Sequence, residues 1–202
     1  MISVETKLLE KIRSIPRGEL ILPEDLYHLG SSEAVRVALH RLTQEKLIVR
    51  VTHGIYVRPK VSKLIGLLTP TAEEVAIAIA KRDKIRIVPT GSYALNALGL
   101  STQVPMNIVL LTDGSAREIK VGKQKIKFKR TTPKNLLAKG KISGLVIQAL
   151  KEIGNGHLTA EDEQKIMALL EKENSSHLQH DIALAPVWVQ KIMKKSLRGE
   201  KD

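Results

Sequence analysis

The most restrictive feature of this sequence is a pair of β-rich runs that directly follows a helical pattern. The runs cover residues 47–51 and 55–57, and a Thr-His-Gly turn at 52–54 separates them. This spacing, with glycine in the turn, predicts a β-hairpin. The helical pattern before it ends near residue 45, so the chain passes from a helix into a hairpin within a few residues.

Two further helices and a short apolar run precede this pair of elements. Apolar residues recur at three- and four-residue steps over 4–15, which predicts the first helix. Pro23 followed by two acids predicts the start of a second helix, which Gly30 ends after about two turns. Three helices, the apolar run at 20–22 and a basic hairpin, in this order, predict a winged helix-turn-helix over residues 1–66.

The third predicted helix divides into an apolar and a polar face. The residues expected to pack inward are Val35, Ala38, Leu39 and Leu42. The opposite face suits a DNA major groove, because arginine can pair with guanine and glutamine with adenine. The predicted DNA contacts of turn, helix and hairpin are Ser31, Ser32, Arg36, Val37, His40, Arg41, Gln44, Arg50, His53, Arg58 and Lys60. Two alternatives stay open: the charged face is merely solvated, or the winged helix binds protein.

Net charge favours a polyanionic partner. Lys and Arg number 33 against 21 Asp and Glu, a formal charge of +12, of which residues 67–140 alone carry +8 and residues 141–202 carry none. Such an excess is typical of nucleic-acid binding. Because the chain has only one Trp, three Tyr and one Phe, base stacking on aromatic side chains is disfavoured, and double-stranded DNA is the expected ligand.

Residues 67–202 are predicted to form a second, larger α+β domain. Residues 59–70 are expected to form an apolar connector that docks onto a surface rather than a flexible tether. The domain then alternates helical and strand patterns, and its sheet is expected to be mainly antiparallel. Its predicted helices are 71–84, 90–98, 141–153, 159–173, 178–184 and 186–197, and its predicted strands are 85–88, 107–112, 117–121 and 125–130.

The last predicted strand carries a row of lysines on one face. Because side chains alternate along a strand, Lys125, Lys127 and Lys129 point one way while Ile126 and Phe128 point the other. The basic patch predicted around this strand comprises Arg117, Lys120, Lys123, Lys125, Lys127, Lys129 and Arg130. It is a candidate nucleic-acid contact. The alternatives are an acidic protein partner and an edge strand on which lysines prevent aggregation.

The sequence does not predict an enzyme. Residues 88–92 form a strand and Gly-Ser turn that resemble the opening of a nucleotidyltransferase domain, so a degenerate core of that kind is an open alternative. That family holds metal through carboxylates on the next strand, where this chain has Asn107 and Val109. His177 and His180 have helical spacing but no evident third ligand. No cofactor, metal site or catalytic residue is therefore predicted.

Composition also bears on the compartment. The chain has no cysteine, which excludes disulfides and thiol nucleophiles. It has neither an apolar run long enough to span a bilayer nor the order of a signal peptide at its start. A cytoplasmic protein without a membrane partner is expected.

Several motifs resemble the AbiE-type antitoxins of bacterial type IV toxin–antitoxin and abortive-infection systems. They are Ala-Leu-His-Arg-Leu at 38–42, the hairpin residues 49–56, Pro-Thr-Gly-Ser-Tyr-Ala-Leu-Asn at 89–96 and Leu-Gly-Leu at 98–100. The similarity runs from about residue 5 to residue 150. It implies that the winged helix represses the promoter of its own operon and that the larger domain opposes a nucleotidyltransferase-like toxin.

Overall fold

The computed structural model describes residues 3–64 and 66–197. The chain divides into two compact units. The first contains the residues up to Lys84 together with 119–125, and the second contains 85–118 and the residues from 126 onward. Both units combine helices with antiparallel strands, which confirms the predicted α+β class. The division falls later than the predicted boundary at 66/67.

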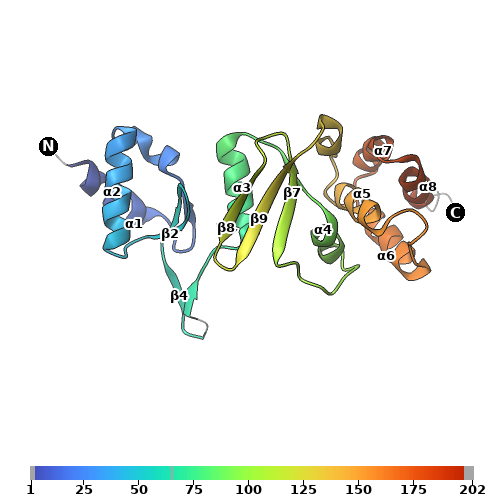
Figure 1. Ribbon diagram of the computed structural model, residues 1–202, viewed down its shortest axis with the longest axis horizontal. Helices are drawn as coiled ribbons and strands as arrows, with labels where there is room; N and C mark the ends of the chain where they lie inside the picture. Colours follow the sequence, from blue (N-terminus) through green and yellow to red (C-terminus); the bar gives the residue numbers. More distant parts are fainter. Residues whose placement is uncertain (1–2, 65, 198–202) are drawn as a thin grey trace. The chain divides into compact units, whose positions relative to one another are not determined.

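Figure 1 shows the helices of the first unit as a ribbon, and its three α-helices each begin at a side-chain cap. The Ser3 hydroxyl accepts a hydrogen bond from the N–H of Thr6, and the Ser31 hydroxyl accepts one from the N–H of Ala34. The predicted second helix is a 3-10 helix rather than an α-helix. The helices are α1 (Val4–Ser14), η1 (Pro23–Leu29), α2 (Ser32–Gln44) and α3 (Ala72–Asp83).

The first unit also contains a three-stranded antiparallel sheet, which lies next to its helices in the chain. Its order is β1-β3-β2, with β1 (Leu20–Ile21), β2 (Val49–Thr52) and β3 (Ile55–Val57). Gly54 has a φ of +66° in the β2–β3 turn, a conformation that favours glycine. The core below is built from residues of α1, η1, α2 and the adjoining strands: Leu8, Ile12, Ile21, Leu26, Val35, Ala38, Leu39, Leu42 and Ile48.

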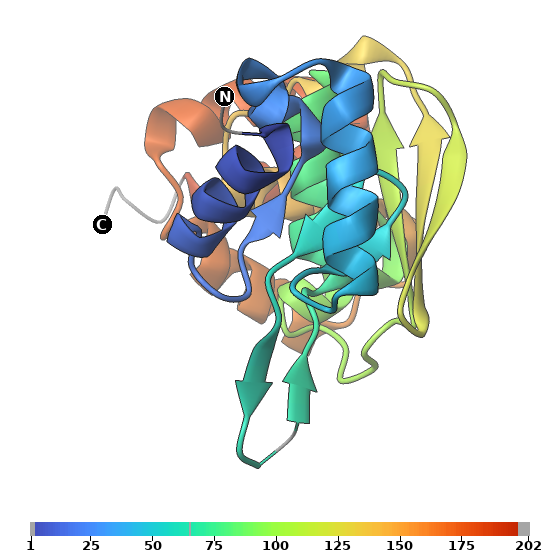
Figure 2. The same cartoon turned by 90° about the vertical axis from the view of Figure 1, so that its left-hand side faces the viewer.

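The predicted apolar connector is a second β-hairpin. Strands β4 (Lys60–Ser62) and β5 (Gly66–Leu68) pair antiparallel, with Val61 opposite Leu67. Figure 2 shows this hairpin extending away from α1 and α2. Val61, Leu64 and Leu67 are exposed, so the described part of the chain does not bury them, and docking of the connector stays a prediction. Residue 65 of the connector lies outside the described residues.

The second unit contains most of a four-stranded sheet, in which β6 and β7 pair antiparallel, and a group of helices. The strand order is β6-β7-β9-β8. The strands are β6 (Ile87–Pro89), β7 (Asn107–Thr112), β8 (Arg117–Val121) and β9 (Gln124–Arg130). The helices are α4 (Gly91–Ala97), η2 (Pro133–Leu136), α5 (Lys141–Ile153), α6 (Ala160–Leu170), α7 (Ser175–Leu184) and α8 (Val187–Ser196).

The helices of the second unit share one core, in which α5 is central. Seven of its residues are buried, and it packs against α4, α6, α7 and α8. Leu150, Ile166 and Val189 are inaccessible to solvent there. Trp188, the only tryptophan of the chain, packs against the same cluster. The predicted amphipathic patterns of this region therefore correspond to packing faces.

Candidate nucleic-acid interface

The outer face of α2 is exposed as predicted. We define the outer α2 face as Glu33, Arg36, Val37, His40 and Gln44, with Arg41 at its margin, and all six are exposed. Val35, Ala38, Leu39 and Leu42 on the opposite side are at most 3 % exposed. The division of the helix into an inner and an outer face is therefore confirmed. The core fixes which side chains a ligand can meet.

The polar side chains of the outer α2 face differ in whether they form hydrogen bonds or ion pairs with other residues. Arg36 makes no hydrogen bond or ion pair with another residue of the described chain. His40 Nε2 and Gln44 Nε2 are 3.2 Å apart. Arg41 Nη1 lies 2.9 Å from Glu5 Oε2 of α1. Because exposed ion pairs contribute little stability, Arg41 can exchange Glu5 for another anion at small cost.

An open cleft adjoins the first turn of α2. Its volume is about 440 Å³, and its lining includes Ser31, Glu33, Val37 and Arg41 together with Glu5. The Ser31 oxygen caps α2, which leaves its hydroxyl hydrogen available to an acceptor in the cleft. Ser32 is exposed beside it. This end of the helix therefore offers both donors and carboxylates to a ligand.

The β2–β3 hairpin carries the next predicted contacts. Arg50 Nη2 lies 2.8 Å from His53 Nδ1, and both side chains are exposed. Arg58 has a structural role that its sequence context does not reveal. Its guanidinium donates to the carbonyl oxygens of Arg13 (2.6 Å) and Ile15 (2.8 Å) at the end of α1. Lys60 is exposed on β4 rather than on the β2–β3 hairpin.

The prediction missed a wider basic segment in the first unit. Residues 46–72 contain no Asp or Glu, while they contain five Lys or Arg residues and one His. Lys46, which lies at the C-terminal end of α2 with a φ of +59° and is exposed, was not among the predicted contacts. The absence of acids over 27 residues was the signal that could have identified this segment.

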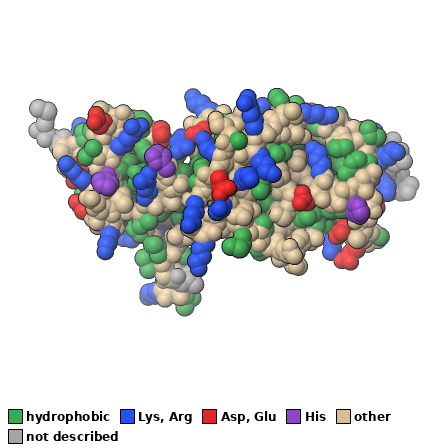
Figure 3. Space-filling model, viewed as in Figure 1, with side chains coloured by type: hydrophobic (Ala, Val, Ile, Leu, Met, Phe, Trp, Pro, Cys, Tyr) green, Lys and Arg blue, Asp and Glu red, His purple; other side chains and the backbone are tan. Residues whose placement is uncertain are grey.

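The lysines of β9 lie on the exposed side of an inner strand. Figure 3 colours the Lys and Arg side chains on one face of the molecule blue. Lys125, Lys127 and Lys129 are exposed, whereas Ile126 and Phe128 are at most 1 % exposed, so the predicted alternation is confirmed. β9 lies between β7 and β8. The edge-strand explanation of these lysines is therefore wrong, because an inner strand has no free edge to protect.

The remaining basic patch does not form one surface. Arg117 is half-buried, and its Cζ lies 5.2 Å from the centre of the Phe128 ring, on the side opposite the lysines. Lys120, Lys123 and Arg130 are exposed. The patch is also divided between the two units, since residues 119–125 belong to the first.

The strand and Gly-Ser turn that resemble the start of a nucleotidyltransferase domain lie where α4 packs close to Glu152. Asn107 is exposed at the start of β7 and Val109 is half-buried within it. Gly91 begins α4 with a φ of +57°, and a Cβ atom there would lie 3.1 Å from the Glu152 carboxylate. Because glycine has no side chain, the turn leaves room for the Glu152 carboxylate. Among the described residues, no three His, Cys, Asp or Glu side chains are grouped so that they could hold a metal ion.

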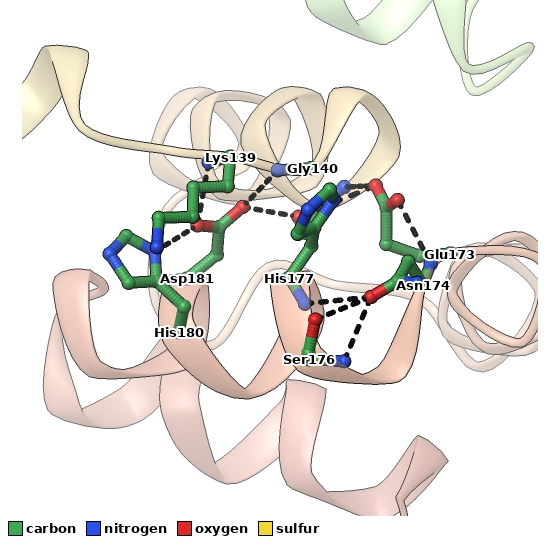
Figure 4. Close-up of polar contacts among 9 residues, drawn as sticks. Lys139, Gly140, Glu173, Asn174, Ser176, His177, His180 and Asp181 are labelled. Carbon is green, nitrogen blue, oxygen red and sulfur yellow. Dashed lines mark hydrogen bonds and ion pairs between the residues drawn. The ribbon is translucent and has the colours of Figure 1, made fainter.

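A buried carboxylate cluster lies at the start of α5 (Figure 4). Asp181 is fully buried and accepts hydrogen bonds from the N–H groups of Lys139 and Gly140, both at 2.8 Å. The Ser143 hydroxyl donates to the same carboxylate at 2.5 Å, and His180 Nδ1 lies 2.7 Å from it. Asp181 thus joins α7 to the first turn of α5.

A second carboxylate completes the cap of α5. Glu173 Oε2 accepts from the N–H groups of Ile142 (2.8 Å) and Ser143 (3.1 Å). Burial raises the pKa of Asp181, but the hydrogen bonds from Ser143, His180 and the two backbone amides outweigh it and hold that pKa below its ordinary value. Both acids therefore satisfy backbone donors that would otherwise be unpaired.

This cluster lacks the geometry of a nucleophilic site. A serine nucleophile needs a base within hydrogen-bond reach. Here Asp181 lies between Ser143 and His180, and Ser143 is fully buried. The His180 side chain therefore orients a structural acid. His177 contributes a backbone N–H to the Asn174 cap of α7.

Comparisons with known proteins place the chain in a family without an assigned activity. The chain belongs to DUF6088, a family of unknown function, whose model matches residues 7–178. It is similar to the crystal structure of RV2827C protein from Mycobacterium tuberculosis, with a TM-score of 0.47 and 13 % identity over 95 % of this chain and 81 % of that chain. No curated protein matches. Within the described ranges, none of the helices has the length and apolar character needed to cross a membrane.

Proposed function

We propose that residues 1–66 are a winged helix-turn-helix that binds double-stranded DNA and represses its own promoter. The observation that carries the proposal is the exposure of the outer α2 face beside a basic hairpin in the same unit. In the order α1-β1-η1-α2-β2-β3, α2 corresponds to the recognition helix and β2–β3 to the wing.

The roles of individual side chains follow from their chemistry. Arg36, without a partner in the described chain, presents parallel donors that fit O6 and N7 of guanine. Gln44 suits adenine, and the exposed Val37 suits a thymine methyl group. Arg50 and His53 of the wing contact phosphate or a minor groove. Arg58 supports the wing rather than the DNA, because two of its donor bonds go to α1.

The antitoxin role is the second part of the proposal and rests on the resemblance to AbiE-type antitoxins. In this reading the second unit opposes a nucleotidyltransferase-like toxin encoded beside it. Expression of the neighbouring gene product with and without this chain tests the role directly. Growth arrest that this chain relieves supports it, and arrest that persists contradicts it.

The DNA-binding test is a titration of the chain's own upstream duplex at about 50 mM salt and at higher salt. Each phosphate contact contributes about 0.9 to the slope of log affinity against log salt. Arg36→Ala is expected to cost on the order of 1–3 kcal/mol for the preferred site and less for random DNA. Lys191→Ala, an exposed cation on α8, is the matched control. Absence of wild-type binding at low salt contradicts the proposal.

A second candidate function is docking of a polyanionic partner on β9. The observation that favours it is the inner position of this strand, which leaves its three exposed lysines without an edge-protecting role. Capture of the purified neighbouring gene product is compared for wild type and for the variant with Lys125, Lys127 and Lys129 changed to Glu. Equal capture by both excludes this surface.

A further inference from the structure

The β4–β5 hairpin exposes apolar side chains that the described residues do not cover. Leu64 is 94 % exposed near its tip, and the cross-strand pair Val61 and Leu67 is 68 % and 49 % exposed. Isolated apolar residues on a surface are ordinary. Three on one short hairpin that extends away from α1 and α2 (Figure 2) indicate a surface that meets something else.

The charge of the hairpin identifies the kind of partner. Lys60 and Lys63 are exposed on it, and the hairpin lies within the acid-free segment 46–72. A second copy of the chain would bring these lysines together with no carboxylate from either hairpin to balance them. A polyanion whose interior is apolar matches both properties, and duplex DNA has phosphates outside and stacked bases within.

The base of the hairpin is held firmly to the rest of its unit. The N–H of Gly18 donates to the Arg58 carbonyl oxygen at 2.9 Å. Arg17 Nη1 donates to the Pro59 carbonyl oxygen at 3.2 Å, and the Arg58 guanidinium is bonded to the end of α1. The hairpin therefore starts from a fixed point beside the β2–β3 hairpin, and binding does not have to order its base.

We propose that the β4–β5 hairpin enters a minor groove of the bound DNA, where Leu64 wedges between adjacent base pairs while Lys60 and Lys63 contact phosphates. The proposal rests on the proposed DNA-binding function and adds a second point of contact to it. Proteins that bind the minor groove frequently insert Leu, Ile or Phe in this way, and cationic flanks are typical of them.

The dimensions of the hairpin permit insertion. Leu64 lies five residue steps beyond Pro59, which corresponds to about 17 Å of extended chain. The minor groove is about 7.5 Å deep, so the tip reaches the bases while the anchored end stays outside. Flexible pyrimidine–purine steps are the expected insertion points, because they unstack most easily.

The experiment follows binding and unstacking on the same upstream duplex. Fluorescence anisotropy gives affinity between about 50 and 200 mM salt, and permanganate detects thymines that become unstacked. The variants are Leu64→Ser and the pair Lys60→Gln with Lys63→Gln. The matched controls are Val187→Ser, at a valine that is 71 % exposed on α8, and the pair Lys191→Gln with Lys194→Gln.

Wild type and both controls are expected to make one or a few thymines reactive. Leu64→Ser is expected to abolish that reactivity and to weaken binding roughly tenfold, an effect comparable with burial of one leucine side chain. The double lysine variant is expected to lower the salt slope by about 1.8, because two phosphate contacts are lost. All these substitutions lie at exposed positions, and unchanged thermal unfolding confirms intact folding.

Three results overturn the proposal, and each has a different meaning. If wild type binds and Leu64→Ser shows the same affinity and the same thymine reactivity as wild type, the wedge is excluded and the proposed DNA-binding function stays in place. Absence of wild-type binding refutes both. A wild-type dimer in light scattering that Leu64→Ser converts to monomer assigns the hairpin to contact between copies instead.

Discussion

Replacement of Asp181 by Asn tests how much the buried carboxylate stabilises the second unit. Each carboxylate oxygen accepts from two donors: Oδ1 from the Lys139 amide and His180, and Oδ2 from the Gly140 amide and Ser143. An asparagine NH₂ must take one of these two places. The hydroxyl or the imidazole there can change role and accept, but the backbone N–H cannot, so one buried amide loses its acceptor in either orientation.

The magnitude follows from these contacts. A buried donor without an acceptor costs about 1–3 kcal/mol, and hydrogen bonds to a charged group exceed neutral ones by roughly 1 kcal/mol. Asp181→Asn is therefore expected to lower the free energy of unfolding of the second unit by about 3 kcal/mol. Asp113→Asn is the control, because Asp113 also accepts from a backbone N–H and an arginine but is exposed. Its effect is expected to be much smaller.

Urea unfolding monitored by Trp188 fluorescence measures the change, since that tryptophan packs in the same helical core. The pKa of Asp181 is lowered by folding, so its stabilisation is present above the unfolded value of about 3.9 and is lost as pH falls through the lower folded value. The difference between wild type and Asp181→Asn should therefore shrink below about pH 4. Equal urea midpoints at neutral pH, or a loss no greater than that of Asp113→Asn, would refute the reasoning.

Three further predictions use the same measurements. Arg58→Gln removes the paired hydrogen bonds to α1 and is expected to lower the melting temperature through a loss of about 1–3 kcal/mol; an unchanged transition would contradict this role. Gly91→Ala should cost about 1–2 kcal/mol, because φ is +57° and the new methyl group meets Glu152; calorimetry that detects no loss argues against it. Glu5→Gln releases Arg41 and is expected to raise DNA affinity and the salt slope with little effect on stability; weaker DNA binding would exclude Arg41 as a phosphate contact.

Local patterns were sufficient where a single element determines the outcome. The apolar spacing of α2 identified its buried side. The alternation of β9 likewise followed from the period of a strand. Each of these features depends on neighbours within about four residues, which the sequence displays directly.

Features that depend on residues far apart in the sequence could not be predicted from local patterns. The hydrogen bonds of Arg58 join residues more than forty positions apart, and those of Asp181 reach back about as far to the start of α5. The sequence led to the prediction of Arg58 as a DNA contact and gave no sign of the role of Asp181. The inner position of β9 depends on the order of the strands in the sheet, which the pattern of a single strand does not reveal. The β4–β5 hairpin was missed because its strands are three residues each and lack a long alternating run.

The link between α7 and α5 has a consequence for how the protein can be shortened. The family match stops at residue 178, three positions before Asp181. A fragment cut there would lose more than a terminal helix, because the amides of Lys139 and Gly140 would be left without their acceptor. Asp181 thus supports the start of an element that begins some forty residues earlier in the chain, so removal of the last segments is expected to destabilise the middle of the unit as well as its end.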